Sequence, residues 1–347
     1  MGLRTYVKSF FSFSIGTWIG ALISFFTTPI VSYLIIPEEF GRASMFTLVY
    51  SILLTTCVLG LDQSFVRFYY EMPQEKRKSL FWESVSLPLV NSILASIILV
   101  IFQDNLSRWL FQSSYPNVGL LLSVSLLTGI LQAFNQLSIR MQKKGLMFSS
   151  IQIISSVSNV SFTILYAKFI SANFYAVIFG QICGNIVALF VGSVYDKASR
   201  SLSSVSYQNI KKYIRYGIPF LPTFLISWLF NSIDRISLRQ YSTFTEIGLY
   251  SAAFKLVSAM NLIQTGFTTF WSPLVYERYS NKPEDKEFYR KAFLGISLAM
   301  YLFGLTLIGL KDIIFLLFSK SYRDAAYIAP FLLFMPIMYT TSETTVV

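Results

Sequence analysis

Residues Ala292–Leu310 read AFLGISLAMYLFGLTLIGL, an apolar run without a charged side chain that lies between Lys291 and Lys311. A helix that crosses the hydrocarbon core of a bilayer needs about 20 predominantly apolar residues, with a range of about 17 to 25. The length and composition of this run therefore predict a transmembrane helix.

Similar runs recur along the whole chain. Together with Ala292–Leu310 they are Ser9–Pro37, Ala43–Leu61, Ser84–Gln103, Trp109–Ile139, Gly145–Ala167, Phe169–Tyr195, Tyr216–Ile233, Ile247–Tyr276 and Ala325–Ser342. Because backbone groups in lipid must be paired within the segment, such runs form helices. The sequence predicts an all-α polytopic membrane protein with about ten transmembrane helices.

The composition agrees with a lipid-facing surface. Charged residues make up 13% of the chain, against roughly 25% in soluble domains, and the mean hydropathy is +0.56. The net charge of +11 lies in short turns between apolar runs, which is not the pattern of a nucleic-acid-binding face. The chain has no histidine, and its two cysteines, Cys57 and Cys183, lie inside separate apolar runs. We therefore expect no metal site and no cofactor.

The distribution of Lys and Arg predicts the orientation. Nineteen of the 28 basic residues lie in the N-terminal segment and in every second loop after it, and eight lie in the alternate loops. Cytoplasmic loops carry the excess of Lys and Arg in membrane proteins. The N-terminus is therefore expected in the cytoplasm.

An internal repeat is visible on either side of the longest connection. Glu39–Ser44 (EFGRAS) corresponds to Glu246–Ser251 (EIGLYS) at an offset of 207 positions, and Leu22–Phe26 resembles Leu225–Leu229 at an offset of 203. A repeat unit of this length holds six spans. An even number of spans gives both copies the same orientation, as in transporters with a cavity between two bundles.

The repeat divides the chain into three predicted parts. Residues 1–195 form an N-terminal lobe of six transmembrane helices, 196–215 a cytoplasmic linker, and 216–347 a C-terminal lobe with about four. A second lobe of six helices would extend beyond Val347. On this prediction the second lobe is incomplete and the chain is a fragment of a longer protein.

Several short motifs, in order along the chain, resemble one known family. They are Pro29–Ser32 with Pro37–Gly41, Gly60–Gln63 with Arg67–Tyr69, Asn231 with Asp234 and Arg235, and Gly248–Ser251 leading to Lys255. With these motifs the chain resembles the oligosaccharide flippase family, the polysaccharide-transporter branch of the MOP superfamily. The resemblance covers essentially the whole chain.

The resemblance implies a fold of two six-helix lobes and a function in transport rather than catalysis. The expected substrate is a polyprenyl-diphosphate-linked oligosaccharide, moved by alternating access from the cytoplasmic to the outer leaflet of a bacterial or archaeal plasma membrane. Cell-surface polysaccharides such as the O-antigen of lipopolysaccharide are made from such carriers. Expected partners are membrane lipids, a polysaccharide polymerase and glycosyltransferases, and not nucleic acid.

Charges within or beside the spans are the candidate site residues. A charge at the centre of a membrane helix costs about 2.5–3.5 kcal/mol on insertion scales. Lys255 lies inside a span, and Arg67 and Arg235 lie at span ends, where arginine could bind phosphate bidentately. We expect these three to line a cationic cavity. The alternative roles are snorkelling or pairing with an acid for Lys255, and structural ion pairs for the arginines.

Two carboxylates accompany these cations in the sequence. Asp62 lies close to Arg67, and Asp234 directly precedes Arg235. They are candidates either for coupling to a proton or sodium ion or for structural ion pairs at helix ends.

Three other functions remain open at this stage. A drug or cation antiporter of the same superfamily would need carboxylates deep in the spans, which are absent from the apolar runs. A membrane enzyme of polysaccharide assembly is disfavoured by the short outer loops and the lack of histidine. A membrane scaffold without transport activity is compatible with the sequence.

Overall fold

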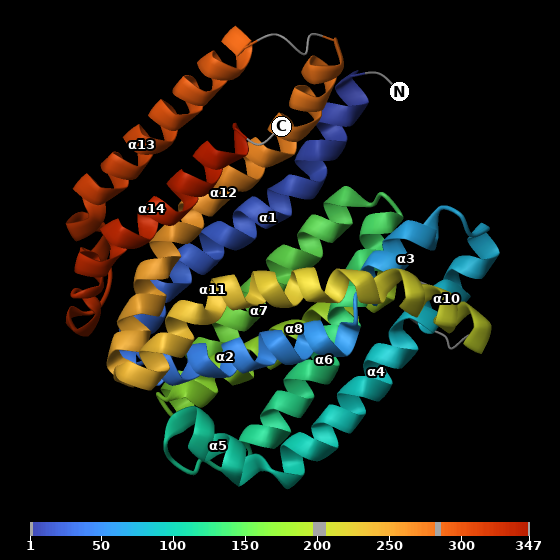
Figure 1. Ribbon diagram of the computed structural model, residues 1–347. Helices are drawn as coiled ribbons and strands as arrows, with labels where there is room; N and C mark the ends of the chain where they lie inside the picture. Colours follow the sequence, from blue (N-terminus) through green and yellow to red (C-terminus); the bar gives the residue numbers. More distant parts are fainter. Residues whose placement is uncertain (1–2, 197–205, 282–285, 346–347) are drawn as a thin grey trace.

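The computed structural model describes residues 3–196, 206–281 and 286–345, and every regular element within these ranges is helical. The long helices in chain order are α1 (Leu3–Ser32), α2 (Pro37–Val58), α4 (Arg77–Ile101), α6 (Val118–Met141), α7 (Gly145–Phe169), α8 (Phe174–Tyr195), α11 (Leu221–Tyr241), α12 (Phe244–Asn281), α13 (Lys286–Leu316) and α14 (Ala325–Glu343) (Figure 1). Shorter helices are α3 (Leu61–Tyr69), α5 (Gln103–Phe111) and α10 (Tyr207–Gly217), with 3-10 turns at Gln74–Lys76, Ile218–Phe220 and Lys320–Tyr322. The predicted all-α class is confirmed.

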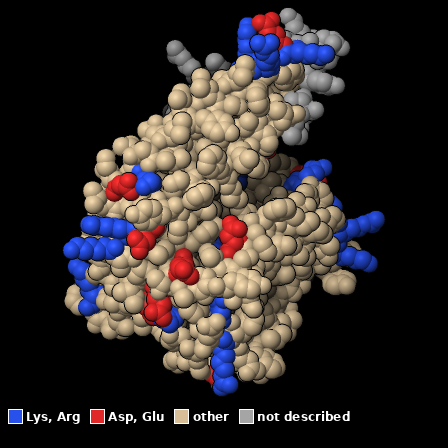
Figure 2. Space-filling model, turned by 60° about the vertical axis from the view of Figure 1, so that its left-hand side comes forward, with Lys and Arg blue, Asp and Glu red and all other residues tan. Residues whose placement is uncertain are grey.

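Eight helical segments of the described chain are long and apolar enough to cross a membrane. Helices α1 and α12 also have the length to cross, at 30 and 38 residues. With them the spans correspond to the ten apolar runs of the sequence. Figure 2 shows charged side chains at the upper tip and from about mid-height downwards on one face, with uncharged surface between the two groups.

The outer face of α4 shows how the helices are turned towards lipid. Ile93, Ile97 and Ile101 follow one another at four-residue spacing and are 51–68% exposed. Leu94 and Ile98 extend the same stripe. Large apolar side chains that recur at helical spacing on the outside fit a hydrocarbon solvent, because in water such a patch would be covered.

The expected span over Ala43–Leu61 ends earlier than the apolar run. Leu59 and Gly60 adopt left-handed backbone conformations, with φ of 52° and 72°, and these end α2 and turn the chain into α3. A Cβ atom on Gly60 would lie 2.3 Å from the carbonyl oxygen of Gly217. The turn therefore packs directly on the end of α10, an approach that only glycine allows.

The apolar run Trp109–Ile139 is likewise divided. Helix α5 ends at Phe111 and α6 begins at Val118, and the flanking residues Gln112 and Asn117 both have positive φ. The Ser- and Pro-containing connection between them cannot continue a helix. Trp109 thus lies on a short helix beside the span and not within it.

Buried side chains form cores on two sides of the molecule. One core joins α12, α13 and α14, and two others join α2 with α4, α6, α8 and the short helices α3, α5 and α10. Figure 1 shows α12, α13 and α14 as a slanting layer at the upper left, while α4, α5 and α6 lie at the lower side. Helix α1 packs along both α7 and α12, and α11 packs along α2.

Part of the predicted linker is an ordered amphipathic helix. Residues 197–205 of the expected 196–215 connection lie outside the described residues, whereas α10 follows from Tyr207. Its Tyr213 is fully buried against α3 and α4, and its Lys211 is exposed. The connection is therefore fastened to the first bundle over its second half.

Candidate functional site: a cationic pocket between α1, α2, α7, α11 and α12

A pocket of about 530 Å³ lies where α1, α2, α7, α11 and α12 meet. Its polar lining consists of hydroxyl and amide side chains together with two cations, and it contains no carboxylate from the described residues. The polar lining residues are Ser24, Thr27, Thr28, Ser44, Thr47, Ser155, Ser156, Asn159, Thr163, Asn231, Arg235, Tyr250, Ser251, Lys255 and Ser258. The pocket therefore presents positive charge and hydrogen-bonding groups inside an apolar helix bundle.

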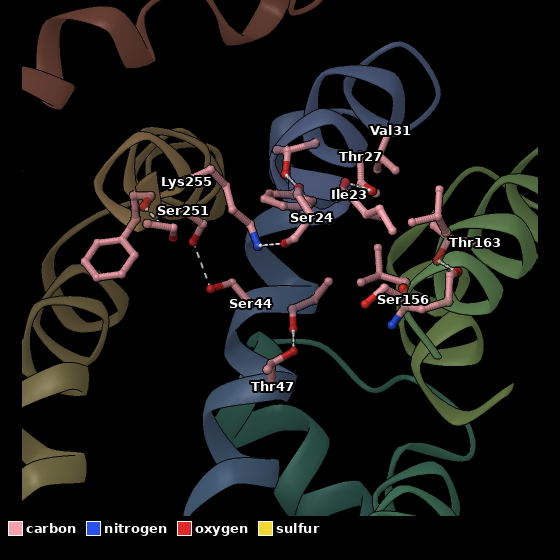
Figure 3. Close-up of a pocket in the computed structure, with 18 of the residues that line it drawn as sticks. Ile23, Ser24, Thr27, Val31, Ser44, Thr47, Ser156, Thr163, Ser251 and Lys255 are labelled. Atoms are coloured by element: carbon pink, nitrogen blue, oxygen red, sulfur yellow. Dashed lines mark hydrogen bonds between the residues drawn. The ribbon is translucent and has the colours of Figure 1, made fainter. Parts of the chain in front are cut away.

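Lys255 enters the pocket from α12. It lies three turns into the helix, and its Nζ donates a hydrogen bond of 3.3 Å to Ser24 Oγ of α1 (Figure 3). A hydroxyl satisfies one of the three ammonium donors, and two remain available to an anion. The structure thus turns Lys255 into the pocket, which favours the cavity role over snorkelling.

Arg235 enters from α11. Its Nη2 donates to the carbonyl oxygen of Asn231, one turn earlier, at 3.2 Å. The other guanidinium donors can still bind two oxygens of an anion such as phosphate. Arg235 and Lys255 therefore face one pocket from two different helices.

The two predicted carboxylates are placed differently from the cations. Asp234 does not line the pocket; its Oδ2 accepts a hydrogen bond of 2.7 Å from the hydroxyl of Tyr250, which does. Asp62 lies in the first turn of α3, where Oδ2 accepts from Gln63 Nε2 at 2.7 Å.

Arg67 also lies outside the pocket. It is exposed on α3 and forms an ion pair of 2.5 Å with Glu71, so its partner is not Asp62. The cause is the left-handed turn at Leu59 and Gly60, which directs α3 away from the pocket and against α10. The structure brings together Arg235 and Lys255 and leaves Arg67 and Asp62 elsewhere.

The sequence interpretation did not single out the serines of the repeat. Ser251 Oγ and Ser44 Oγ lie 2.8 Å apart in the pocket wall (Figure 3), and they are the last residues of the two repeated segments. The repeat contained the signal that could have identified them, because the two serines occupy equivalent positions in its two segments.

At one end of the pocket, next to its lining residues Phe40 and Ala43, the backbones of α2 and α12 pack directly on each other. A Cβ atom on Gly41 would lie 2.0 Å from the carbonyl oxygen of Phe244, and one on Gly248 would lie 1.9 Å from that of Pro37. The two contacts are equivalent in the repeat, because Gly41 corresponds to Gly248 and Pro37 to Phe244 at the offset of 207 positions. Only hydrogen at both positions allows the helices this close.

Charged side chains make further contacts near this end. Arg239 of α11 donates to the carbonyl oxygens of Leu110 and Trp109 at 2.8 and 2.9 Å, and so caps the C-terminus of α5. Glu39 of α2 accepts from the backbone N–H of Phe174, the first residue of α8, at 2.8 Å, and pairs with Arg42. These contacts tie the elements on both sides of the pocket together at this end.

Solved structures of known transporters have a similar fold. The chain is similar to an inward-facing multidrug resistance MATE family transporter of the MOP superfamily, with a TM-score of 0.66, 15% identity, and coverage of 97% of this chain and 84% of that one. The lipid II flippase MurJ in an inward closed conformation gives a TM-score of 0.67 at 15% identity, over 96% of this chain and 75% of that one. The protein thus has the fold of MOP-superfamily transporters.

The family follows from the sequence. A family model for polysaccharide biosynthesis proteins matches residues 6–277, so the chain belongs to that family. The Lsg locus putative protein 1 of Haemophilus influenzae is 24% identical over 283 residues, which cover 77% of this chain. The matched part spans 65% of the length of that relative. The predicted family resemblance is confirmed.

Proposed function

We propose that the protein moves a polyprenyl-diphosphate-linked oligosaccharide from the cytoplasmic to the outer leaflet of a bacterial or archaeal plasma membrane. The product would serve the synthesis of a cell-surface polysaccharide such as O-antigen. The observation that carries this proposal is the presence of Arg235 and Lys255 in a pocket whose described lining holds no carboxylate.

The two cations fit a diphosphate. Arginine offers a planar fork that matches phosphate oxygens, and lysine offers a compact charge with three donors. Attraction between such charges is stronger in a bundle of low dielectric constant than in water. Arg235 and Lys255, on α11 and α12, would hold the headgroup from two sides.

The neutral polar lining fits sugars. A sugar cannot cross hydrocarbon without replacing its hydrogen bonds to water, because each unpaired polar group costs several kcal/mol. Serine, threonine and asparagine side chains from α1, α2 and α7 line the pocket wall. They would pair with sugar hydroxyls while the polyprenyl tail stays in the lipid.

Movement would come from two lobes with the predicted boundaries, 1–195 and 216–347, joined by 196–215. The close contact of α2 and α12 at Gly41 and Gly248 supports a pivot or gate between them. With the N-terminus in the cytoplasm, rocking at this contact would expose the pocket first to one side and then to the other.

The membrane potential would assist the step. A negative charge that moves outward gains about 2.3 kcal/mol per 100 mV when the inside is negative. No coupling carboxylate is required on this account. The lining also weighs against a drug or cation antiporter, because the described lining residues of the pocket include no carboxylate that could bind a cation.

Reconstitution tests the proposal. Liposomes that contain the protein and a fluorescent polyprenyl-diphosphate oligosaccharide should show protein-dependent loss of the lipid from the leaflet in which it starts. A polyprenol-linked oligosaccharide without the diphosphate is the matched control, and it should move slowly. Equal rates for both lipids would contradict a role for the cations, and no transport of either would contradict the function.

A further inference from the structure

A second basic pocket, of about 680 Å³, lies at the ends of α3, α6 and α8 and the beginnings of α4 and α7. We call it the α4–α7 pocket. Four cations line it, Arg77 and Lys78 from the start of α4 and Lys143 and Lys144 from the connection between α6 and α7. It shares no lining residue with the first pocket.

Two of the four cations, Arg77 and Lys143, lie against aromatic rings. The Arg77 guanidinium carbon lies 4.6 Å from the centre of the Tyr69 ring and 5.8 Å from that of Tyr70. Lys143 Nζ lies 5.4 Å from the centre of the Tyr70 ring. The Tyr70 hydroxyl in turn donates to the carbonyl oxygen of Met141 at 2.7 Å, which joins the two connections. Tyr70 therefore holds Arg77 and Lys143 together although both are positive.

The cations of this pocket outnumber the carboxylates among its described lining residues. None of the four cations has an ion-pair partner in the part of the chain that the structure describes, and Arg77 Nε is buried without a hydrogen-bond partner there. Asp196 is the one described carboxylate in the lining, and its Oδ1 accepts from Gln142 Nε2 at 2.9 Å. Four cations against one carboxylate leave the described lining with a net positive charge, and such a pocket attracts anions.

The backbone and the surroundings of the pocket point to a lipid rather than a soluble anion. Lys143, which lines the pocket, has a φ of 60°, an uncommon conformation for lysine. Leu146 and Val194, just beyond the lining residues Lys144 and Tyr195, are 69% and 48% exposed. An anion bound here would lie beside apolar surface that can receive an acyl or prenyl chain. Tyrosines such as Tyr195 are typical of the membrane interface.

We propose that the α4–α7 pocket binds the phosphate of an anionic lipid headgroup. The phosphate would lie between Arg77 and Lys143, with Lys78 and Lys144 as outer charges. The lipid that supplies this phosphate is either a membrane phospholipid or a polyprenyl diphosphate. Both present the same phosphate oxygens to the pocket. The proposal does not depend on transport through the first pocket.

Native mass spectrometry of the full chain in detergent tests the proposal. Three ligands separate the sources: phosphatidylglycerol, undecaprenyl diphosphate and inorganic pyrophosphate, with phosphatidylcholine as the zwitterionic reference. At least one of the two anionic lipids should bind more tightly than phosphatidylcholine. Arg77→Gln with Lys143→Gln should lower the affinity for that lipid about 30-fold, which is the effect of removing two charges at about 1 kcal/mol each.

Two further variants keep the result interpretable. Lys211→Gln with Lys212→Gln removes the same charge from α10, outside the pocket, and should leave binding unchanged. Arg77→Lys with Lys143→Arg keeps both charges and should retain most of the binding. Equal losses in the pocket and α10 variants would overturn the site, as would unchanged binding in the pocket variant. Pyrophosphate that binds as tightly as either lipid would overturn the assignment to a lipid.

Discussion

Ser44 Oγ and Ser251 Oγ lie 2.8 Å apart, although the two residues are 207 positions apart in the sequence. The same offset separates Gly41 from Gly248, and each of these glycines faces a backbone carbonyl of the other helix. The reciprocal contacts place the serine pair close to a local two-fold axis between α2 and α12. The internal repeat of the sequence thus coincides with a self-complementary helix contact.

Cysteines at these two positions should form a disulfide. We predict that Ser44→Cys with Ser251→Cys oxidises readily when Cys57 and Cys183 are replaced by alanine, because the two hydroxyls already touch and a disulfide needs Cβ atoms about 3.5–4.5 Å apart. The cross-link is measured by a gel-mobility shift after cleavage between the two helices. If α2 and α12 separate during the transport cycle, the oxidised protein should also lose transport and regain it on reduction.

The matched control for the cross-link uses Ser258, which lines the same pocket two turns further along α12. Seven residues of helix advance about 10 Å, beyond disulfide reach. Ser44→Cys with Ser258→Cys should therefore stay reduced. Equal cross-linking of both pairs would contradict the α2–α12 contact.

A methyl group at Gly248 should destabilise the protein. In Gly248→Ala the new Cβ atom would meet the carbonyl oxygen of Pro37 at 1.9 Å, so the helices must move apart, and overpacking of this kind typically costs about 1–3 kcal/mol. Thermal unfolding in detergent measures the effect. Gly309→Ala is the control, because its Cβ atom meets open space and alanine favours a helix by about 1 kcal/mol. A Gly248→Ala protein as stable as the control would refute the close approach.

Removal of the Arg239 side chain should loosen α5. Arg239→Ala deletes two hydrogen bonds from a charged donor to the last carbonyls of that helix, each worth about 1.5–3 kcal/mol. Hydrogen exchange should then rise over residues 103–117. Arg108→Ala, at an exposed position on α5 itself, should leave the exchange unchanged. Similar hydrogen exchange in Arg239→Ala and Arg108→Ala would show that the hydrogen bonds of Arg239 do not stabilise α5.

Glu83 should hold α10 against the first bundle. Its carboxylate is 2% exposed and accepts hydrogen bonds from the N–H of Ser206 at 3.1 Å, from Asn209 Nδ2 at 2.9 Å and from the Tyr213 hydroxyl at 3.2 Å. Glu83→Gln replaces one acceptor oxygen with a donor, so we predict faster hydrogen exchange across α10.

The control for this change is Glu75→Gln, because Glu75 is exposed at the end of the preceding connection. It removes the same charge and should leave α10 protected. Protection of α10 that survives Glu83→Gln would show that apolar packing of Tyr213 is sufficient to hold the helix.

Much of the fold could be predicted from the sequence because lipid imposes a simple rule. Apolar runs such as Ala292–Leu310 must be helices, and their lengths follow from the bilayer thickness. The break between Gln112 and Asn117 was not predicted because only charged residues were taken to end a run, although Ser113, Ser114 and Pro116 mark it. The left-handed turn at Leu59–Gly60 was not predicted because the apolar run continues through it to Leu61. Such breaks depend on packing partners, here Gly217 of α10, that are distant in the sequence.

The candidate site shows the same limit. Lys255 was recognisable because a charge inside a span is costly, and Arg235 because it stands at a span end. Arg67 looked equivalent, and only the direction of α3 separates it from the pocket. The hydroxyl lining could not be identified, because serine and threonine also pair with their own helix backbone, as Thr47 does with Ala43.

The most direct test of the account is the rate at which a fluorescent polyprenyl-diphosphate oligosaccharide is flipped in liposomes by charge-removal variants. Arg235→Gln and Lys255→Met should each slow the flip roughly 10- to 100-fold, the loss of one charge-assisted hydrogen bond of about 1.5–3 kcal/mol. Arg67→Gln, which removes the same charge outside the pocket, should flip at the wild-type rate. Wild-type rates for both pocket variants, or an equal loss in all three, would contradict a substrate site formed by Arg235 and Lys255.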